Sequence, residues 1–183
     1  MSTSQDRAPE LQVEQWFNSP QPISLQALRG RIVVLHAFQM LCPGCVAHGL
    51  PQATAISETF PRDEVVVLGL HSVFEHHAAM PPLALQAFLQ EYRIGFPVGV
   101  DRPAPSGPVP LTMQAYGLRG TPSLVLVDRL GSIRLHHFGR MDDLRLGAMI
   151  GALRVEPVAE REALRTGASV PHCDGDACAL TES

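Results

Sequence analysis

The 183-residue sequence predicts one α/β domain, built on a central mixed β-sheet with helices on both faces and a C-terminal β-hairpin plus helix. Three observations support this prediction. Residues 31–38 and 65–70 are apolar and rich in β-branched side chains, which is typical of strands covered on both faces. Helical patterns follow each of these stretches, giving a β-α-β-α order. Residues 121–139 then form two strand-like runs around a tight turn, which predicts an antiparallel hairpin.

The first predicted strand is followed by two cysteines at positions 42 and 45, and residues 46–60 after them have a helical composition despite an internal proline, Pro51. Because proline lacks an amide hydrogen and crowds the preceding turn, we expect this helix to be bent. A second helix is predicted after the second strand, at residues 83–92, where apolar side chains recur at helical spacing.

Residues 96–100 predict a short third strand, and the proline-rich residues 101–110 predict a loop, because proline cannot donate a backbone hydrogen bond. A short helix is expected near residues 112–116. Asp142 or Asp143 can cap a final helix, and a further helical piece is expected at residues 157–165.

The expected domain spans residues 11–165, between a disordered N-terminal segment at residues 1–10 and a flexible, Cys-containing tail at residues 166–183. No apolar run approaches the roughly 20 residues that a membrane helix needs, so no membrane partner is expected. The N-terminus lacks the cationic and apolar pattern of a secretory signal, and four cysteines are too few for a disulfide-stapled scaffold. The sequence therefore favours a cytoplasmic protein.

Charge excludes several function classes. The formal net charge is −4, and no lysine is present for a Schiff base or a phosphate-binding loop of the G-K-[ST] kind. The fourteen arginines are scattered rather than gathered, which argues against a nucleic-acid partner.

A cysteine pair, Cys42-Pro43-Gly44-Cys45, lies where the first strand meets the first helix. At a helix N-terminus, unpaired amide hydrogens favour a thiolate, so Cys42 is the candidate nucleophile. Cys45, one helical turn along, could attack the mixed disulfide that Cys42 forms with a partner. A structural disulfide or half of a zinc site is the alternative interpretation of an isolated C-x-x-C motif.

Three stretches, residues 23–38, 92–101 and 116–139, resemble the thioredoxin superfamily, and more closely its TlpA/ResA-like branch of thiol-disulfide oxidoreductases. The resemblance covers roughly residues 11–153. It implies a thioredoxin-like fold and dithiol-disulfide exchange with a protein or low-molecular-weight thiol partner. A reductase or glutathione is the expected electron donor, and the redox-active disulfide needs no cofactor or metal.

The same resemblance implies roles for individual residues. The peptide bond before Pro122 is expected to be cis, with Thr121 pairing with an extended substrate, and Pro43 and Gly44 are expected beside it. His36 stands where the family often has a carboxylate that exchanges a proton with Cys45, and an imidazole could do the same. A core histidine satisfied by a backbone carbonyl is the equally weighted alternative.

The motif also departs from the family pattern. Leu41 replaces the usual aromatic residue and the proline has moved to position 43, which suggests a more oxidising pair than thioredoxin's. A thiol peroxidase is the second hypothesis, but Gln39 and Leu35 occupy the places of the peroxiredoxin threonine and proline. A non-catalytic thioredoxin-fold binding module is the third.

The tail carries the other two cysteines, Cys173 and Cys178, which are separated by four residues. They are candidates for an auxiliary redox pair. With His172 they supply three potential ligands, fewer than a closed tetrahedral zinc site needs, and adventitious thiols are the alternative.

Overall fold

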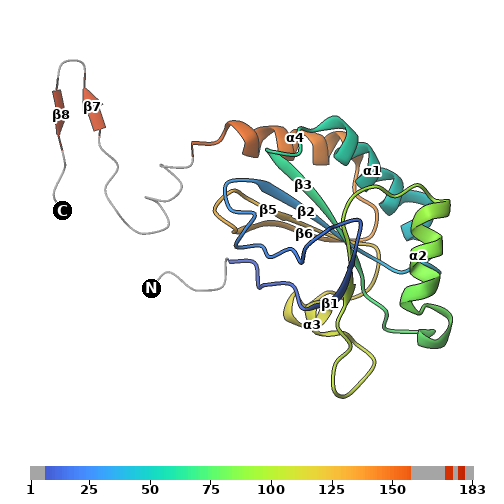
Figure 1. Cartoon of the computed structure of the whole chain (residues 1–183). Helices are drawn as coiled ribbons and strands as arrows, with labels where there is room; N and C mark the ends of the chain where they lie inside the picture. The colour runs from blue at the N-terminus through green and yellow to red at the C-terminus, as the bar shows by residue number, and fades with distance from the viewer. Residues whose placement is uncertain (1–6, 158–171, 175–176, 180–183) are drawn as a thin grey trace.

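The computed structural model describes residues 7–157, 172–174 and 177–179 (Figure 1). In these residues a six-stranded sheet has the order β1-β4-β3-β2-β5-β6. Its strands are β1 (Val13–Phe17), β2 (Ile32–Phe38), β3 (Val65–His71), β4 (Val98–Asp101), β5 (Ser123–Val127) and β6 (Ile133–Phe138). The helices are α1 (Leu50–Thr59), α2 (Pro82–Glu91), α3 (Leu111–Ala115) and α4 (Asp143–Val155), with a π-helical turn at Cys45–Gly49 and a 3-10 turn at His77–Ala79. Two further strands, β7 (His172–Asp174) and β8 (Ala177–Ala179), form a two-stranded antiparallel sheet.

Strand β2 lies inside the sheet and every one of its residues is buried. It pairs in parallel with β3 and antiparallel with β5, while β5 and β6 form the antiparallel hairpin that the sequence predicts. The sheet is therefore mixed, as expected. β1 pairs antiparallel with β4 at the far edge, and the sequence patterns did not predict it.

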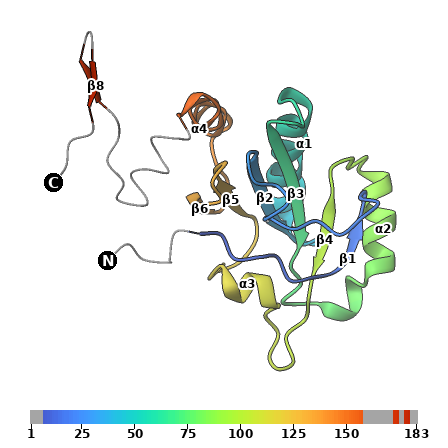
Figure 2. The same cartoon turned by 60° about the vertical axis from the view of Figure 1, so that its left-hand side comes forward.

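The two faces of the sheet form two apolar cores, because side chains of a strand alternate between faces. Val34 and Phe38 of β2 pack in the core that includes buried residues of α1, α2 and α4. Leu35 and Ala37 pack in the other core, with α3 and the N-terminal segment. Helices thus cover both faces, and Figure 2 shows α3 on the side of the sheet away from α1 and α4.

Residues 7–10 differ from the expectation of disorder. The Ala8 amide donates to the Gly131 carbonyl at 2.9 Å, and the Tyr116 hydroxyl donates to the Pro9 carbonyl at 2.6 Å. Ala8 is also buried. These hydrogen bonds and this burial tie the segment to the domain, and a polar composition gave no indication of such long-range partners. The expectations for residues 1–6, 158–171, 175–176 and 180–183 lie outside the described residues.

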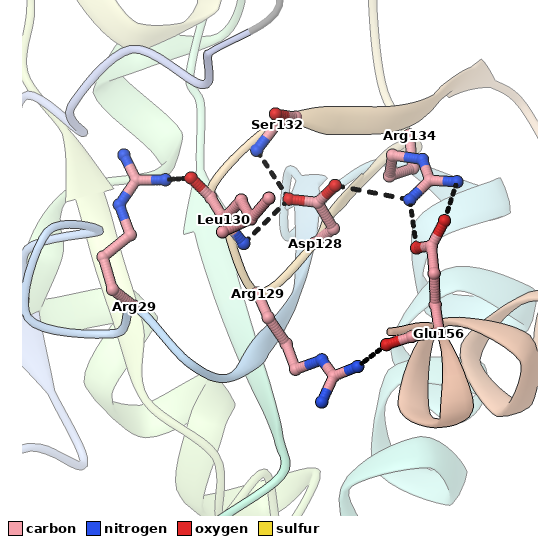
Figure 3. A network of polar contacts seen from close by, with 7 residues as sticks. All are labelled: Arg29, Asp128, Arg129, Leu130, Ser132, Arg134 and Glu156. Carbon is pink, nitrogen blue, oxygen red and sulfur yellow. Dashed lines mark hydrogen bonds and ion pairs between the residues drawn. The ribbon is translucent and has the colours of Figure 1, made fainter. Parts of the chain in front are cut away.

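A polar network fixes the turn between β5 and β6 (Figure 3). The Asp128 carboxylate accepts hydrogen bonds from the Leu130 amide at 3.0 Å and the Ser132 amide at 2.8 Å. Arg134 bridges Asp128, at 3.3 Å, to Glu156 at the end of α4, at 2.6 Å. The hairpin is thereby joined to the last helix of the domain.

Arginines on either side extend this network. Arg29 donates to the Leu130 carbonyl, and Arg129 donates to the Glu156 carbonyl (Figure 3). Gly131 closes the turn with φ +78°, a conformation that residues with a side chain rarely adopt. The turn predicted from an Asp-x-x-Gly sequence is confirmed.

Asp142 caps α4, since its carboxylate accepts from the Arg145 amide at 2.9 Å. Of the two alternative caps that the sequence predicts, Asp142 is the one observed. Within the described part of the chain, no helix has both the length and the apolar character needed to cross a bilayer.

Candidate active site

The Cys pair lies where β2 gives way to helix. Backbone helical hydrogen bonds begin at Cys42, whose carbonyl accepts from the amides of Cys45 and Val46, both at 3.1 Å. The Cys45 amide also donates to the Cys42 sulfur at 3.2 Å, so Cys42 acts as the N-cap residue. Pro43 follows at the first helical position, where its missing amide hydrogen costs no helical bond.

The two thiols have different surroundings, and both are free. Cys42 is half-buried, whereas Cys45 is completely buried. Burial raises the pKa of the Cys45 thiol to about 12, and its hydrogen bond with Cys42 acts in the same direction. A hydrogen bond with the Gln39 backbone and one with the Thr121 side chain lower the pKa of Cys45 and so oppose this rise. Cys42 is therefore the accessible sulfur, and Cys45 holds its proton.

The loop before β5 packs against the pair. The Thr121–Pro122 peptide bond is cis, and the Cys42 thiol donates to the Thr121 carbonyl at 3.5 Å. A Cβ placed on Gly44 would lie 3.4 Å from Cδ of Pro122, an ordinary van der Waals contact. The Gly139 amide donates to the Pro122 carbonyl at 2.8 Å, which holds the loop to the end of β6. The structure thus brings together the predicted residues Cys42, Gly44, Thr121 and Pro122.

A π-helical turn replaces the simple proline bend expected in the first helix. The Leu50 amide donates to the Cys45 carbonyl, one residue further back than in an α-helix, and Pro51 follows directly. Gly49 ends this wide turn. A Cβ there would lie 2.8 Å from Cε1 of His36 and 3.3 Å from Cβ of Pro122. The helix can approach this closely only because residue 49 is glycine, a role that a glycine inside a helical pattern could have suggested.

His36 lies beneath this turn and is 2% exposed. Burial lowers its pKa to about 4, against an opposing hydrogen bond with the Gln52 side chain. Its Nδ1 has no hydrogen-bond partner among the described residues, so the expected alternative of a ring satisfied there by a carbonyl is not observed. The ring is uncharged at neutral pH and a weak base. The contributions to the Cys45 pKa come from Cys42, Gln39, Thr121 and burial.

A cavity of about 310 Å³ adjoins the site, with His36, Gly49, Gln52, Pro122 and Met141 among its lining residues. Pro122 lies between the Cys motif and this cavity, because it is next to Gly44 and also lines the cavity. The cavity lies between the first helix and the start of α4.

Two buried polar residues, His71 and Gln39, hold the loop before the Cys pair. No pattern in the sequence predicted this structural role. Nε2 of His71 accepts from the Met40 amide at 3.4 Å. The Gln39 side chain accepts from the Phe74 amide at 3.3 Å and donates to Glu75 at 3.4 Å. Leu41, by contrast, is 58% exposed beside Cys42. An apolar surface therefore borders the accessible sulfur.

The second predicted cysteine pair, in the tail, belongs to two strands that follow α4 in the chain. Cys173 is in β7 and Cys178 is in β8, and the strand register places them opposite each other. No group of three or more potential metal ligands occurs in residues 7–157 or in the described residues of these two strands.

The chain is similar to a known protein family and to several known proteins. Residues 4–136 match the AhpC/TSA family. The thiol-disulfide oxidoreductase ResA of Halalkalibacterium halodurans is 26% identical over 121 residues, which are 66% of this chain and 61% of ResA. The chain thus spans less than two thirds of the length of that relative.

Two solved structures are more similar. A thioredoxin-like superfamily protein, SPOA0173, is 58% identical with a TM-score of 0.81, over 83% of this chain and 98% of its own. A thiol-disulfide isomerase from Corynebacterium glutamicum is 48% identical with a TM-score of 0.81, over 85% of this chain and all of its own.

Proposed function

The chain belongs to the AhpC/TSA family and has the thioredoxin-like fold, and on this basis we propose that it exchanges dithiols for disulfides through Cys42 and Cys45. The observation that carries the proposal is the pairing of one accessible and one buried thiol across a single helical turn. The Cys45 amide lies 3.2 Å from the Cys42 sulfur, which is also beside the Thr121 carbonyl. The names of the similar oxidoreductase and isomerase support the same reaction.

In the first step, the Cys42 thiolate attacks one sulfur of a partner disulfide. A mixed disulfide forms and the other partner sulfur leaves as a thiol. Cys45 then loses its proton and attacks the Cys42 sulfur, which releases the second partner thiol and leaves a Cys42–Cys45 disulfide. The partner gains two electrons and the pair loses two. A reductase or glutathione would return the pair to the dithiol in a cytoplasmic setting.

Substrate recognition is assigned to the surface around Cys42. Thr121 offers backbone groups to an extended polypeptide, and Pro122, Pro43 and Gly44 form the adjoining wall. Pro43 and Leu41 are both exposed, so an apolar residue next to the partner cysteine would be covered on binding. A protein partner or a small thiol can both reach this sulfur.

His36 receives a positioning role. Its uncharged ring packs against Gly49 and lines the same cavity as Pro122, so it supports the loop rather than accepting the Cys45 proton. A pH profile tests this role. If His36 only positions the loop, His36→Gln lowers the rate without moving the apparent pKa values of the exchange reaction. A shift in those values would restore His36 as the proton acceptor.

Reduction of insulin disulfides by a dithiol tests the proposal itself. Wild-type protein should accelerate the reaction, and Cys42→Ser should abolish the acceleration. Cys45→Ser is the matched variant, since it should capture the partner as a lasting mixed disulfide without turnover. Equal activity of Cys42→Ser would overturn the assignment of the nucleophile. No activity with any dithiol would favour a binding module.

A peroxidase reaction is the outcome that would redirect the proposal. The Gln39 side chain is engaged with Phe74 and Glu75 and stands where peroxiredoxins have threonine. We therefore expect slow consumption of hydrogen peroxide. Rapid consumption with Cys42 oxidised to the sulfenic acid would contradict this expectation.

A further inference from the structure

The strands β7 and β8 form an antiparallel pair in which Cys173 lies opposite Cys178. Only two residues, 175 and 176, separate the strands, and the closing pair is Asp174 with Ala177. The C-x-x-x-x-C spacing alone did not require the two cysteines to be cross-strand neighbours. The strand register adds this information.

The register also indicates the type of pair. In a hairpin with a two-residue loop, the residues that flank the loop exchange backbone hydrogen bonds, and successive pairs then alternate. The Cys173–Cys178 pair is the next one, so it is a non-hydrogen-bonded pair with an expected Cα–Cα separation of about 4.5 Å. Disulfides are found at Cα separations of roughly 4.4–6.8 Å. The backbone placement thus meets the distance requirement for a disulfide.

We propose that Cys173 and Cys178 form a second dithiol–disulfide couple, which exchanges electrons with the Cys42–Cys45 pair of the same chain. The strand register supports the couple, because it places the two residues opposite each other. Its exchange with the Cys42–Cys45 pair rests on the proposed function of that pair.

The exchange balances without any further reactant. A thiolate of the reduced tail attacks the Cys42 sulfur of the oxidised active pair, and Cys45 leaves and takes up a proton. The second tail thiolate then attacks the tail sulfur of the mixed disulfide and expels Cys42. Two electrons pass from the tail to the active pair, and the reverse sequence returns them. Cys42 is the sulfur attacked because it is accessible, whereas Cys45 is fully buried.

Chain length allows this exchange within one molecule. Fourteen residues, 158–171, join the two described parts, and they can span at most about 50 Å. A domain of about 150 residues has a radius of gyration near 15 Å and is roughly 40 Å across. The maximum span of the connecting chain therefore exceeds the width of the domain that carries Cys42.

The first experiment tests the couple without the active pair. Trypsin cleavage after Arg165 gives one peptide, 166–183, that contains both tail cysteines and no others. In the Cys42→Ser, Cys45→Ser double variant, oxidised glutathione should close the pair, so that neither cysteine is alkylated before reduction and both are alkylated after it. Adding Cys173→Ser should prevent closure and leave Cys178 to react with alkylating agent or glutathione. Two freely alkylated cysteines after oxidation would overturn the proposal.

The second experiment tests exchange. In a Cys45→Ser variant with an oxidised tail, Cys42 should attack the tail disulfide and link peptide 32–62 to peptide 166–183 at the mass of a monomer. Two outcomes would contradict the intrachain exchange and leave the proposed function intact. In the first, Cys42 captures insulin but never the tail. In the second, Cys42 forms a disulfide with the tail only of another molecule. If Cys42 captures neither, the proposed function fails, and the first experiment still decides whether the tail couple exists.

Discussion

At the scale of single residues, the difference between the two active-site thiols arises from burial rather than from sequence. Cys42 and Cys45 are the same residue type three positions apart, but Cys42 is partly exposed and Cys45 lies in the apolar core with Phe38 and Met40. A buried thiolate loses its hydration, so the proton stays on Cys45 until the reaction reaches it. This asymmetry suits the two proposed steps, in which Cys42 attacks the partner disulfide and Cys45 then attacks the mixed disulfide.

Alkylation measures the asymmetry directly. At pH 7 iodoacetamide should alkylate Cys42 of the reduced native protein. The alkylation of Cys45 should be slower by a factor of ~100 or more, because burial raises the pKa of Cys45 to about 12. Mass spectrometry of peptide 32–62 reads both positions. The control is the same reaction in denaturant, where both cysteines should react alike. Comparable rates in the native protein would contradict the buried thiol.

At the scale of elements, the π-helical turn and its glycine place the first helix against the cis-proline loop. Gly44 and Gly49 both face Pro122, but they differ in the room available. A Cβ at residue 44 meets ordinary contacts, and a Cβ at residue 49 runs into the His36 ring. The two positions therefore form a matched pair for testing which glycine the site requires.

Gly49→Ala should lower the free energy of unfolding by about 1–3 kcal/mol, because the added methyl overpacks the contact with His36. Gly44→Ala should be neutral or stabilising by up to ~1 kcal/mol, since alanine is the better helix former. Chemical denaturation measures both. The double variant Gly49→Ala, His36→Ala should recover part of the loss through coupling of the two sites. Equal effects at positions 44 and 49 would contradict the contact.

The hairpin network offers a second comparison between elements. Asp128→Ala should cost about 2 kcal/mol of unfolding free energy, because it removes the acceptor of two backbone amides and one partner of Arg134. Glu156→Gln should cost less than ~1 kcal/mol, since both partners of that ion pair are partly exposed. Denaturant titration of the two variants tests the order. A larger effect of Glu156→Gln would show that the ion pair is the main support of the turn.

At the scale of the whole molecule, two apolar cores meet at β2 and β3, and each of these strands buries one histidine near the end that faces the active site. His36 is 2% exposed and His71 is 1% exposed. Burial lowers the pKa of each ring to about 4. The folded domain therefore keeps both imidazoles neutral, and charging either one opposes folding.

Acid should destabilise the protein between pH 6.5 and 4. In this window the unfolded histidines, with pKa values near 6.5, bind protons that the folded state does not, so stability falls as pH falls and is constant above the window. The expected loss is about 3 kcal/mol per histidine by pH 4. Urea unfolding across the pH series measures it, with His71→Gln expected to reduce the slope.

Most of the fold could be predicted because its periodicities are local. β2, β3 and the hairpin of β5 and β6 were predicted within a residue or two, as was the Asp142 cap of α4. β1 was not predicted, since a half-exposed edge strand has little apolar pattern. The order of residues 7–10 was missed for a related reason, because it depends on partners more than 100 residues away.

The sequence by itself determined the fold family, the Cys42–Cys45 pair and the proline loop expected beside it, because spacing and residue type along one chain carry that information. Only the tertiary structure decided which thiol is buried, that Gly49 must lack a side chain, that His36 is neutral, and that Cys173 stands opposite Cys178. These properties depend on solvent exclusion and on contacts between distant segments. Desolvation and close packing act through space, so no local pattern in the sequence reports them.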